Sequence, residues 1–489
     1  MTARRWLLAV LLAACIARLW LEPLTSSYWV DELVTVFVAK HPGHPSFAVA
    51  PQVPESIYYW LPRLSSAIFG ESEAAYRIPS LIAMAAALWF IARIAARAIH
   101  PRAGWFAVFT ALSIRGIDYF AVDARPYALG ILAASACMYF LLRWLDSARW
   151  MDAGLFVICA AAVWWVQLIF WPFYLVVAGY FIVRMMNRET PVRSSQWITV
   201  LVVLVAALVP RAFAALALAR NATAHSFAAM PTLHIFEHEL HWNIPVICAG
   251  ALWLLTRFAR PRWRAPRSLW IFLLGWWLCQ PVVLDLYSHA TGNSVYVGRY
   301  FSTMLPAVAL VATAAAAYWM PENCWNPAAV FMGVVALVAQ GHTQSLTYRH
   351  DISDWRSANR EVNRFAPDGS VPVIVVSPFI EGRAPAWTPG YSLPGFLYAH
   401  LEGYPLRGRL LLFPYTGPEL PEALSYAGSL LSSGKLTAPG KWAIYGELPG
   451  VDWEKWFAAQ PRLAGWHHVA KKFGDVIVVE FTAGMSSTQ

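Results

Sequence analysis

Charged residues are scarce in this sequence. Only 13% of the 489 residues are Asp, Glu, Lys or Arg, whereas 58% are hydrophobic and the mean hydropathy is +0.47. A soluble protein of this length cannot bury so much apolar surface. The composition therefore excludes a soluble globular protein and predicts a polytopic membrane protein.

Two further features, few cysteines and the lack of a basic stripe, narrow the class of protein. The sequence has six cysteines, and all of them fall in or beside predicted membrane spans, so no disulfide framework is indicated. The net charge is +9, but the basic residues are dispersed over membrane-flanking loops and form no single stripe. Nucleic acid is therefore not an expected partner.

Long apolar runs are abundant. About eleven of them are long enough to cross the hydrocarbon core as helices. They lie near residues 6–22, 78–98, 103–117, 126–145, 151–166, 169–186, 196–213, 244–258, 268–286, 301–319 and 327–346.

The distribution of arginines predicts the orientation, because short cytoplasmic loops retain positive charge. Alternate loops are basic, and so is the segment before the first span. These arginines are Arg4, Arg5, Arg93, Arg97, Arg102, Arg143, Arg149, Arg184, Arg188, Arg193, Arg257, Arg260, Arg262, Arg264 and Arg267. We expect a multi-pass protein of the inner (plasma) membrane with a cytoplasmic N-terminus. The loop at about 23–77 and the C-terminal segment would then be extracytoplasmic.

The composition changes after the last span. Asp, Glu, Gly, Pro and Lys become frequent, which predicts a membrane domain over 1–346 and a small soluble α/β domain over 347–489. Helical spacing covers 354–365, and strand patterns cover 371–376, 409–413, 441–445 and 475–481. No Gly-rich phosphate loop precedes a helix in this domain, so a lid or docking module is expected.

An acidic pair, Asp31-Glu32, lies at the outer mouth of the first span. It opens a short apolar run that ends at Lys40, which predicts a surface helix with the pair in its first turn. Acidic residues at that position compensate the helix dipole, while ionised groups at a membrane edge also indicate function. The pair alone does not decide between helix capping and catalysis.

A metal-binding pattern also occurs. His234, Glu237 and His238 fit the H-x-x-E-H arrangement of inverted zinc peptidases, in which two histidines on one helix face bind zinc. No third ligand motif follows, so polar residues lining a cavity are the simpler interpretation.

Three segments in order resemble the GT-C glycosyltransferases of the bacterial protein-mannosyltransferase-like and aminoarabinose-transferase-like group. They are the Asp31-Glu32 pair, the stretch from Tyr58-Tyr59-Trp60 through Arg77-Ile78-Pro79-Ser80, and Asp123-Ala124-Arg125-Pro126-Tyr127. Weaker matches are Gly298-Arg299-Tyr300 and Asp354-Trp355-Arg356. One departure is Val53-Pro54-Glu55, where the family usually has consecutive prolines before the aromatic pair.

The resemblance implies a helical GT-C fold with a cavity facing the extracytoplasmic side. It implies a sugar donor linked to polyprenyl phosphate, and a lipid, glycan or protein acceptor whose hydroxyl attacks with inversion. Asp31 would be the general base beside Glu32. Cations would bind the donor phosphate, and other polar residues the substrate. These are Arg125, Arg299, Arg77 and Lys40, with Asp123, Tyr58 and Tyr127. No metal cofactor is expected, although a distant oligosaccharyltransferase branch uses one.

A competing hypothesis is a transporter or flippase of lipid-linked saccharides, in which the external acids and arginines form a gate. Transporters usually show internal repeats and charges at the bilayer midplane. The sequence shows no clear repeat, and its notable charges gather at one face. A catalytically silent scaffold is a third alternative, which the intact Asp31-Glu32 pair disfavours.

Overall fold

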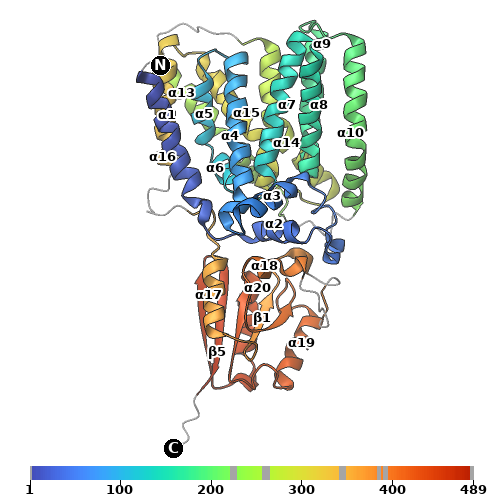
Figure 1. Cartoon of the computed structure of the whole chain (residues 1–489), viewed down its shortest axis with the longest axis vertical. Helices are drawn as coiled ribbons and strands as arrows, with labels where there is room; N and C mark the ends of the chain where they lie inside the picture. Colours follow the sequence, from blue (N-terminus) through green and yellow to red (C-terminus); the bar gives the residue numbers. More distant parts are fainter. Residues whose placement is uncertain are drawn as a thin grey trace, which may run out of the picture. The chain divides into compact units, whose positions relative to one another are not determined.

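The protein forms two compact units in the computed structural model, which describes residues 3–220, 228–255, 265–340, 349–382, 387–388 and 395–484 (Figure 1). The first, here called the helical unit, comprises residues 1–25 and 56–348. The second, the mixed unit, comprises residues 26–55 and 349–489. The chain therefore leaves the helical unit after the first span and returns at Ser56.

The helical unit contains the apolar helices. They are α1 (Ala3–Cys15), continued by the π-helix η1 (Ile16–Leu21), α3 (Trp60–Phe69), α4 (Glu73–Ala98), α5 (Gly104–Leu112), α6 (Arg115–Ala121), α7 (Tyr127–Ser147), α8 (Trp150–Val166), α9 (Phe173–Met186), α10 (Ser194–Arg220), α12 (Leu233–Glu239), α13 (Asn243–Leu255), α14 (Arg267–Thr291), α15 (Leu305–Ala317) and α16 (Trp325–Gln340). Short 3-10 turns are η2 (Pro23–Thr25), η4 (Ile57–Tyr59), η5 (Leu168–Phe170), η6 (Gly298–Met304) and η7 (Glu322–Cys324).

Every predicted span coincides with helical structure, in most cases with one of these helices. Eight helices among the described residues are long and apolar enough to cross a membrane, and two shorter apolar helices cover 150–166 and 243–254. The predicted span at 103–117 is broken at Ser113 into α5 and α6. The predicted span ends at 256–258 and 341–346 lie outside the described residues, as do Arg257, Arg260, Arg262 and Arg264 and the side chains of Arg4 and Arg5.

Small residues bring the central helices together. In α15, with the sequence LPAVALVATAAAA, every residue except Ala315 is buried, and the helix packs against α5, α13 and α14. Alanine allows close backbone approach between membrane helices, where apolar burial alone supplies little attraction. Helices α4, α7 and α8 pack side by side next to this centre (Figure 1).

The mixed unit is built on a five-stranded sheet with the order β2-β1-β3-β5-β4. The strands are β1 (Pro372–Val376), β2 (Arg409–Phe413), β3 (Lys441–Gly446), β4 (Trp466–Phe473) and β5 (Val476–Ala483). Strand β1 is parallel to β2 and β3, whereas β5 is antiparallel to β3 and β4. All five residues of β1 are buried, as its continuous apolar run predicts.

Helices flank this sheet. They are α17 (Trp355–Phe365), α18 (His400–Gly403), α19 (Pro421–Ser432) and α20 (Leu448–Ala458), with short turns η3 (Pro45–Val49), η8 (Ile380–Gly382), η9 (Phe396–Tyr398) and η10 (Pro461–Leu463). Helices α17 and α20 pack on β3 and β5. Four of the strands and α17 match the predicted elements, while β4, α19 and α20 were not predicted.

Helix α2 (Val30–Lys40) belongs to the mixed unit, although more than 300 residues of sequence separate it from the sheet. It packs against α18. The Tyr28 backbone N–H donates to the Tyr404 hydroxyl at 3.0 Å, and the Phe396 N–H donates to Ser46 Oγ at 2.7 Å. These bonds join the 26–55 segment to the C-terminal part of the chain.

Candidate active site

Asp31 and Glu32 occupy adjacent positions in the first turn of α2, as predicted, but their surroundings differ. Trp29 is the N-terminal cap of the helix, and its backbone N–H donates to Glu32 Oε2 at 3.2 Å. This is the reach-back half of a capping box, and it satisfies a donor that the helix itself leaves unpaired. Glu32 is fully buried, whereas Asp31 is partly exposed. Glu32 therefore supplies the cap.

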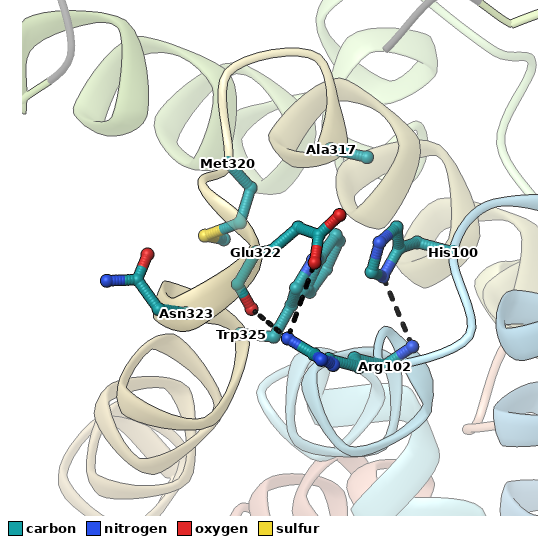
Figure 2. Close-up of a pocket in the computed structure, with 7 residues that line it drawn as sticks. All are labelled: His100, Arg102, Ala317, Met320, Glu322, Asn323 and Trp325. Atoms are coloured by element: carbon teal, nitrogen blue, oxygen red, sulfur yellow. Dashed lines mark hydrogen bonds and ion pairs between the residues drawn. The ribbon is translucent and has the colours of Figure 1, made fainter. Parts of the chain in front are cut away.

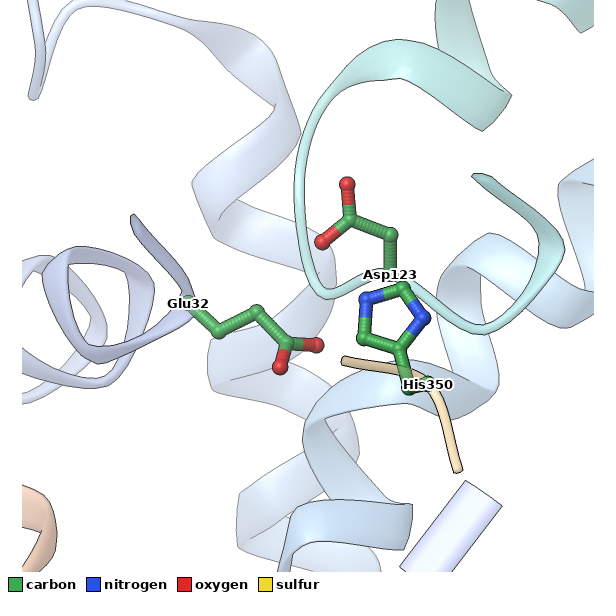
Figure 3. A group of neighbouring side chains, drawn as sticks. All are labelled: Glu32, Asp123 and His350. Carbon is green, nitrogen blue, oxygen red and sulfur yellow. The ribbon is translucent and has the colours of Figure 1, made fainter. Parts of the chain in front are cut away.

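His350 lies next to Glu32 within the mixed unit. A carboxylate oxygen of Glu32 and a ring nitrogen of His350 are within 4.8 Å of each other, and both side chains are buried (Figure 3). The two could bind one divalent ion together. Fixed metal sites commonly use three or four protein ligands, so this pair alone forms an incomplete site.

Asp31 is one of several carboxylates around Glu447, the residue that follows β3. Burial and, to a smaller extent, the negative charges of Asp475, Asp31 and Asp351 together raise the pKa of Glu447 to about 8. Like charges close together disfavour ionisation. Glu447 therefore carries a proton at neutral pH and adds no charge beside Asp31.

Lys40 ends α2 and forms an ion pair within the mixed unit. Its Nζ lies 3.1 Å from Glu402 Oε1, and His41 Nε2 lies 3.2 Å from Glu402 Oε2. Burial raises the pKa of Glu402, but its bonds to Lys40 and His41 outweigh burial and lower it overall. The predicted phosphate ligand Lys40 thus fastens α2 to α18.

Arg77 lies in the second turn of α4, in the helical unit. Gly70 ends α3 with a φ of +82°, and Ser72 Oγ then accepts the Ala75 N–H at 3.2 Å, which starts α4. Arg77 is fully buried, and its Nη1 donates to the backbone carbonyls of Pro23 at 3.3 Å and Leu24 at 3.0 Å. The guanidinium holds the end of the first span against α4.

Asp123 and Arg125 lie in the tight turn between α6 and α7. The Arg125 N–H donates to the Asp123 carbonyl at 2.7 Å, and Pro126 then precedes the first turn of α7. Asp123, also drawn in Figure 3, is fully buried, while Arg125 is partly exposed. The turn thus presents one buried carboxylate and one guanidinium at the same end of the helical unit.

An aromatic pair contacts this turn. Arg125 Nη1 donates to the Tyr59 hydroxyl at 3.2 Å, and the Tyr58 hydroxyl lies 3.2 Å from Ser80 Oγ. Burial raises the pKa of Tyr58 well above its ordinary value, the Ser80 bond opposes this rise, and Asp123 adds to it. The Tyr58-Tyr59, Arg77 to Ser80 and Asp123 to Arg125 segments are therefore joined by hydrogen bonds.

Tyr127 and Arg299 complete the predicted set. Tyr127 is buried with its ring 5.0 Å from that of Phe120. Arg299 is partly exposed in η6, which packs against α7, and its guanidinium lies 5.8 Å from the Tyr300 ring. Arg299 thus belongs to a segment that adjoins the helix starting at Tyr127.

The H-x-x-E-H segment forms the short helix α12. Within the part of the chain that the structure describes, His234, Glu237 and His238 form no group of three metal-ligating atoms. Glu239 instead adjoins the loop that carries Arg299, since a Cβ on Gly298 would lie 2.7 Å from Glu239 Oε2. Burial raises the pKa of Glu239, which His238 partly opposes. These contacts favour a role for the polar residues of α12 in lining the surroundings of the Arg299 loop, rather than in zinc peptidase chemistry.

Four residues of these surroundings were missed from the sequence. Tyr59 and Ser80 stood inside the quoted motif, so their contacts could have been anticipated. His350 and Glu447 had no local signal, because each is brought to α2 by tertiary packing of distant segments.

Comparisons with known proteins bear on the segments that contain these residues. Residues 53–213 match the family model described as dolichyl-phosphate-mannose-protein mannosyltransferase. The matched segment contains Tyr58, Arg77, Asp123, Arg125 and Tyr127. No curated protein sequence matches the chain.

Two solved structures share the architecture over almost the whole chain. They are crystal structures of ArnT from Cupriavidus metallidurans, one bound to undecaprenyl phosphate and one in the apo state. Their TM-scores are 0.57 and 0.58 and their identities 14% and 13%, and each comparison covers 98% of both chains. The chain has the GT-C fold of membrane glycosyltransferases. The predicted fold class is thereby confirmed. Together with the mannosyltransferase match over residues 53–213, it supports the predicted GT-C superfamily.

A more distant similarity involves arabinosyltransferase EmbB from Mycobacterium smegmatis. The TM-score is 0.42 at 15% identity, covering 64% of this chain and 31% of EmbB. At that score the likeness does not bear on the argument. The mannosyltransferase match and the ArnT fold together support a multi-pass membrane glycosyltransferase.

Proposed function

We propose that this GT-C chain transfers a sugar from a polyprenyl-phosphate donor to a hydroxyl of an extracytoplasmic lipid, glycan or protein. The observation that carries the proposal is the mannosyltransferase match over 53–213, whose motif residues are joined by hydrogen bonds at one end of the helical unit. The solved ArnT structure with undecaprenyl phosphate supports a donor of the same lipid class.

The reaction needs a base and an anion site. The acceptor oxygen attacks C1 of the sugar, the bond from C1 to the phosphate oxygen breaks, and the polyprenyl phosphate leaves. The proton of the acceptor hydroxyl passes to the Asp31 carboxylate. Attack opposite the leaving phosphate inverts the anomeric configuration.

Asp31 suits the role of base better than its neighbour. It is partly exposed, whereas Glu32 is buried and accepts the Trp29 N–H. A base must reach the proton that it removes. We therefore assign Asp31 as the base and Glu32 as the residue that positions it.

Arg125 and Arg299 are the proposed phosphate ligands. Both residues are partly exposed, and a guanidinium binds two phosphate oxygens through parallel donors. Arg77 and Lys40 have other tasks in the fold, since Arg77 binds backbone carbonyls and Lys40 pairs with Glu402. Tyr58 and Asp123 support the Arg125 turn.

The test compares the purified protein with an Asp31→Asn variant on a panel of undecaprenyl-phosphate sugars with cell-envelope acceptors, following the new glycosidic bond by mass spectrometry. Loss of a general base lowers turnover by about 100-fold or more, with a smaller effect on donor binding. Asp452→Asn is the matched control, because Asp452 is an exposed carboxylate of the same unit.

Equal turnover by the Asp31→Asn variant would remove Asp31 from the chemistry. Movement of lipid-linked sugar across liposomes without a new glycosidic bond would instead establish the flippase alternative.

A further inference from the structure

A cavity lies in the helical unit, at the opposite end of helix α4 from Arg77. Its volume is about 550 Å³, and it is formed where α4, α5, α15 and α16 end or begin (Figure 2). The lining residues are His100, Arg102, Ala317, Met320, Glu322, Asn323 and Trp325. His100 follows Arg77 by 23 residues, which is about 35 Å along a helix.

The cavity lies at the level where membrane helices terminate. Helix α4 is a candidate span over Glu73–Ala98, the segment Gly298–Ala317 is another, and Glu322–Gln340 is a third. The ends of such spans lie at the bilayer surface, where lipid headgroups are found. Ala317 and Met320 give one wall an apolar surface.

Opposite charges stand side by side in this cavity. Arg102 Nη1 donates to the Glu322 backbone carbonyl at 3.1 Å and lies 3.6 Å from Glu322 Oε2. The two side chains are 59% and 75% exposed, so their attraction is worth under about 1 kcal/mol. A ligand with one anionic and one cationic group can therefore replace the Arg102–Glu322 ion pair at little cost in free energy.

His100 is oriented so that its ring can donate a hydrogen bond from Nε2. Its Nδ1 accepts the Arg102 backbone N–H at 3.2 Å, so the neutral ring carries its proton on Nε2. The ring stacks on Trp325 with centroids 5.1 Å apart and 14° between the planes, and Trp325 is buried. Figure 2 shows the His100 ring, the Trp325 ring and the Arg102–Glu322 pair around one space.

We propose that this cavity binds the headgroup of a phospholipid with a primary ammonium group, of the phosphatidylethanolamine class. The lipid phosphate binds Arg102 and the Nε2–H of His100, while the ammonium donates to the carboxylate of Glu322 and the amide oxygen of Asn323. An anionic headgroup would leave Glu322 without a cation, and a choline headgroup has no N–H to donate.

The experiment measures lipid selectivity of the full-length protein by native mass spectrometry. The protein is incubated with equal amounts of phosphatidylethanolamine, phosphatidylglycerol and phosphatidylcholine in detergent. The wild-type protein should retain the ethanolamine lipid about fivefold over the others, which corresponds to about 1 kcal/mol. Arg102→Ala should remove most of this retention, and Glu322→Gln should shift the preference to phosphatidylglycerol.

Arg93→Ala is the matched control, because Arg93 is an exposed arginine at the same end of α4 that does not line the cavity. It should keep the wild-type selectivity. Selectivity is a ratio within one spectrum, so partial unfolding of a variant does not imitate the shift that Glu322→Gln should cause.

Two results would overturn the proposal. One is equal retention of the three lipids by the wild-type protein. The other is displacement of the bound lipid by soluble phosphoethanolamine at equal concentration, which would identify a soluble ligand as the occupant. The proposal does not depend on the transferase chemistry, because no step of the test uses it.

Discussion

At the scale of single residues, the two members of the acidic pair have separate tasks. Capping and catalysis were equally good interpretations of Asp31-Glu32 in the sequence. The structure assigns the capping bond to Glu32, which accepts the Trp29 N–H, and leaves Asp31 partly exposed at the preceding position. The helix is thus stabilised by one carboxylate while the other remains accessible.

Glu447 gives the protein a pH dependence that can be measured. Its pKa is raised to about 8 by burial and nearby carboxylates, whereas an ordinary glutamic acid titrates near 4.5. The folded state therefore holds more protons than the unfolded state across this window, so stability falls as the pH rises from about 5 to about 8. Above about 8 the slope disappears.

The Glu447→Gln variant should lose this slope, because the amide imitates the protonated acid. Its thermal midpoint should match the wild type near pH 5 and exceed it at pH 8, measured by intrinsic fluorescence of the purified protein. Glu422→Gln, which changes an exposed carboxylate of α19, should behave like the wild type. A slope in Glu447→Gln equal to that of the wild type would contradict the assignment.

The Glu32–His350 pair leads to a prediction about metals. The proposed mechanism uses only Asp31 and arginines, so a chelator should leave sugar transfer within about twofold of its starting rate. Glu32→Ala, which removes the acceptor of the Trp29 N–H, should lower stability by about 1 kcal/mol through the cap, with or without chelator. If the chelator abolished transfer and zinc or magnesium restored it, a metal role for Glu32 and His350 would replace the capping role.

Several residues of the candidate site could be predicted from the sequence, whereas others could be found only in the structure. Asp31, Arg125 and Tyr58 stood in short motifs whose order carries the resemblance. Glu447 and His350 lie more than 300 residues after Asp31, and only the packing of α2 with the C-terminal segment brings them near. A single sequence contains no signal for such a pairing.

At the scale of elements, the length of the apolar runs predicted the membrane helices well. The sequence pattern did not predict the polar strand at the edge of the sheet. Each predicted span coincides with helical structure, because apolar runs of that length have few other stable arrangements in lipid. Strand β4, with the sequence WHHVAKKF, was missed because its residues are largely exposed and lack an alternating apolar pattern. It lies at the edge of the sheet, where lysines discourage pairing with another chain.

The contact between α2 and α18 depends on a glycine. A Cβ on Gly403 would lie 2.6 Å from Leu33 Cδ2, and Leu33 is fully buried. Gly403→Ala should therefore destabilise the mixed unit by about 1–3 kcal/mol and slow sugar transfer, since Leu33 and Asp31 share one helix. Thermal unfolding and turnover measure the two effects.

Two variants make this test specific. Gly428→Ala, in α19, meets nothing within 4 Å and should stabilise by up to about 1 kcal/mol through helix propensity. Leu33→Ala combined with Gly403→Ala should recover part of the loss, because the smaller side chain makes room for the added methyl. Strict additivity of the two substitutions would argue against the contact.

At the scale of the whole molecule, the chain is not divided into two consecutive domains. Residues 26–55 leave the helical unit and pack with residues 349–484, so the proposed base belongs to the unit that carries the sheet. The sequence suggested a lid or docking module without chemistry of its own over 347–489. The structure gives that segment a direct part in holding α2.

A chain that ends at residue 348 tests this dependence. It keeps the complete helical unit and should still insert in the membrane, but α2 loses α18, Glu402 and Tyr404. Sugar transfer should fall by about 100-fold or more, as for loss of the base itself. Coexpression of residues 349–489 as a separate exported polypeptide should restore part of the activity. Full activity of the shortened chain would show that α2 is positioned without its partner.

The division of one unit between two distant stretches of chain also sets an order of events during synthesis. Helix α2 emerges about 360 residues before α18, which at roughly 5–20 residues per second is a delay of about 20–70 s. Throughout that interval the segment with Asp31 lacks the surface that holds it. A ribosome that stops before α18 therefore leaves a membrane protein in which the helix with the proposed base lacks the partner that holds it.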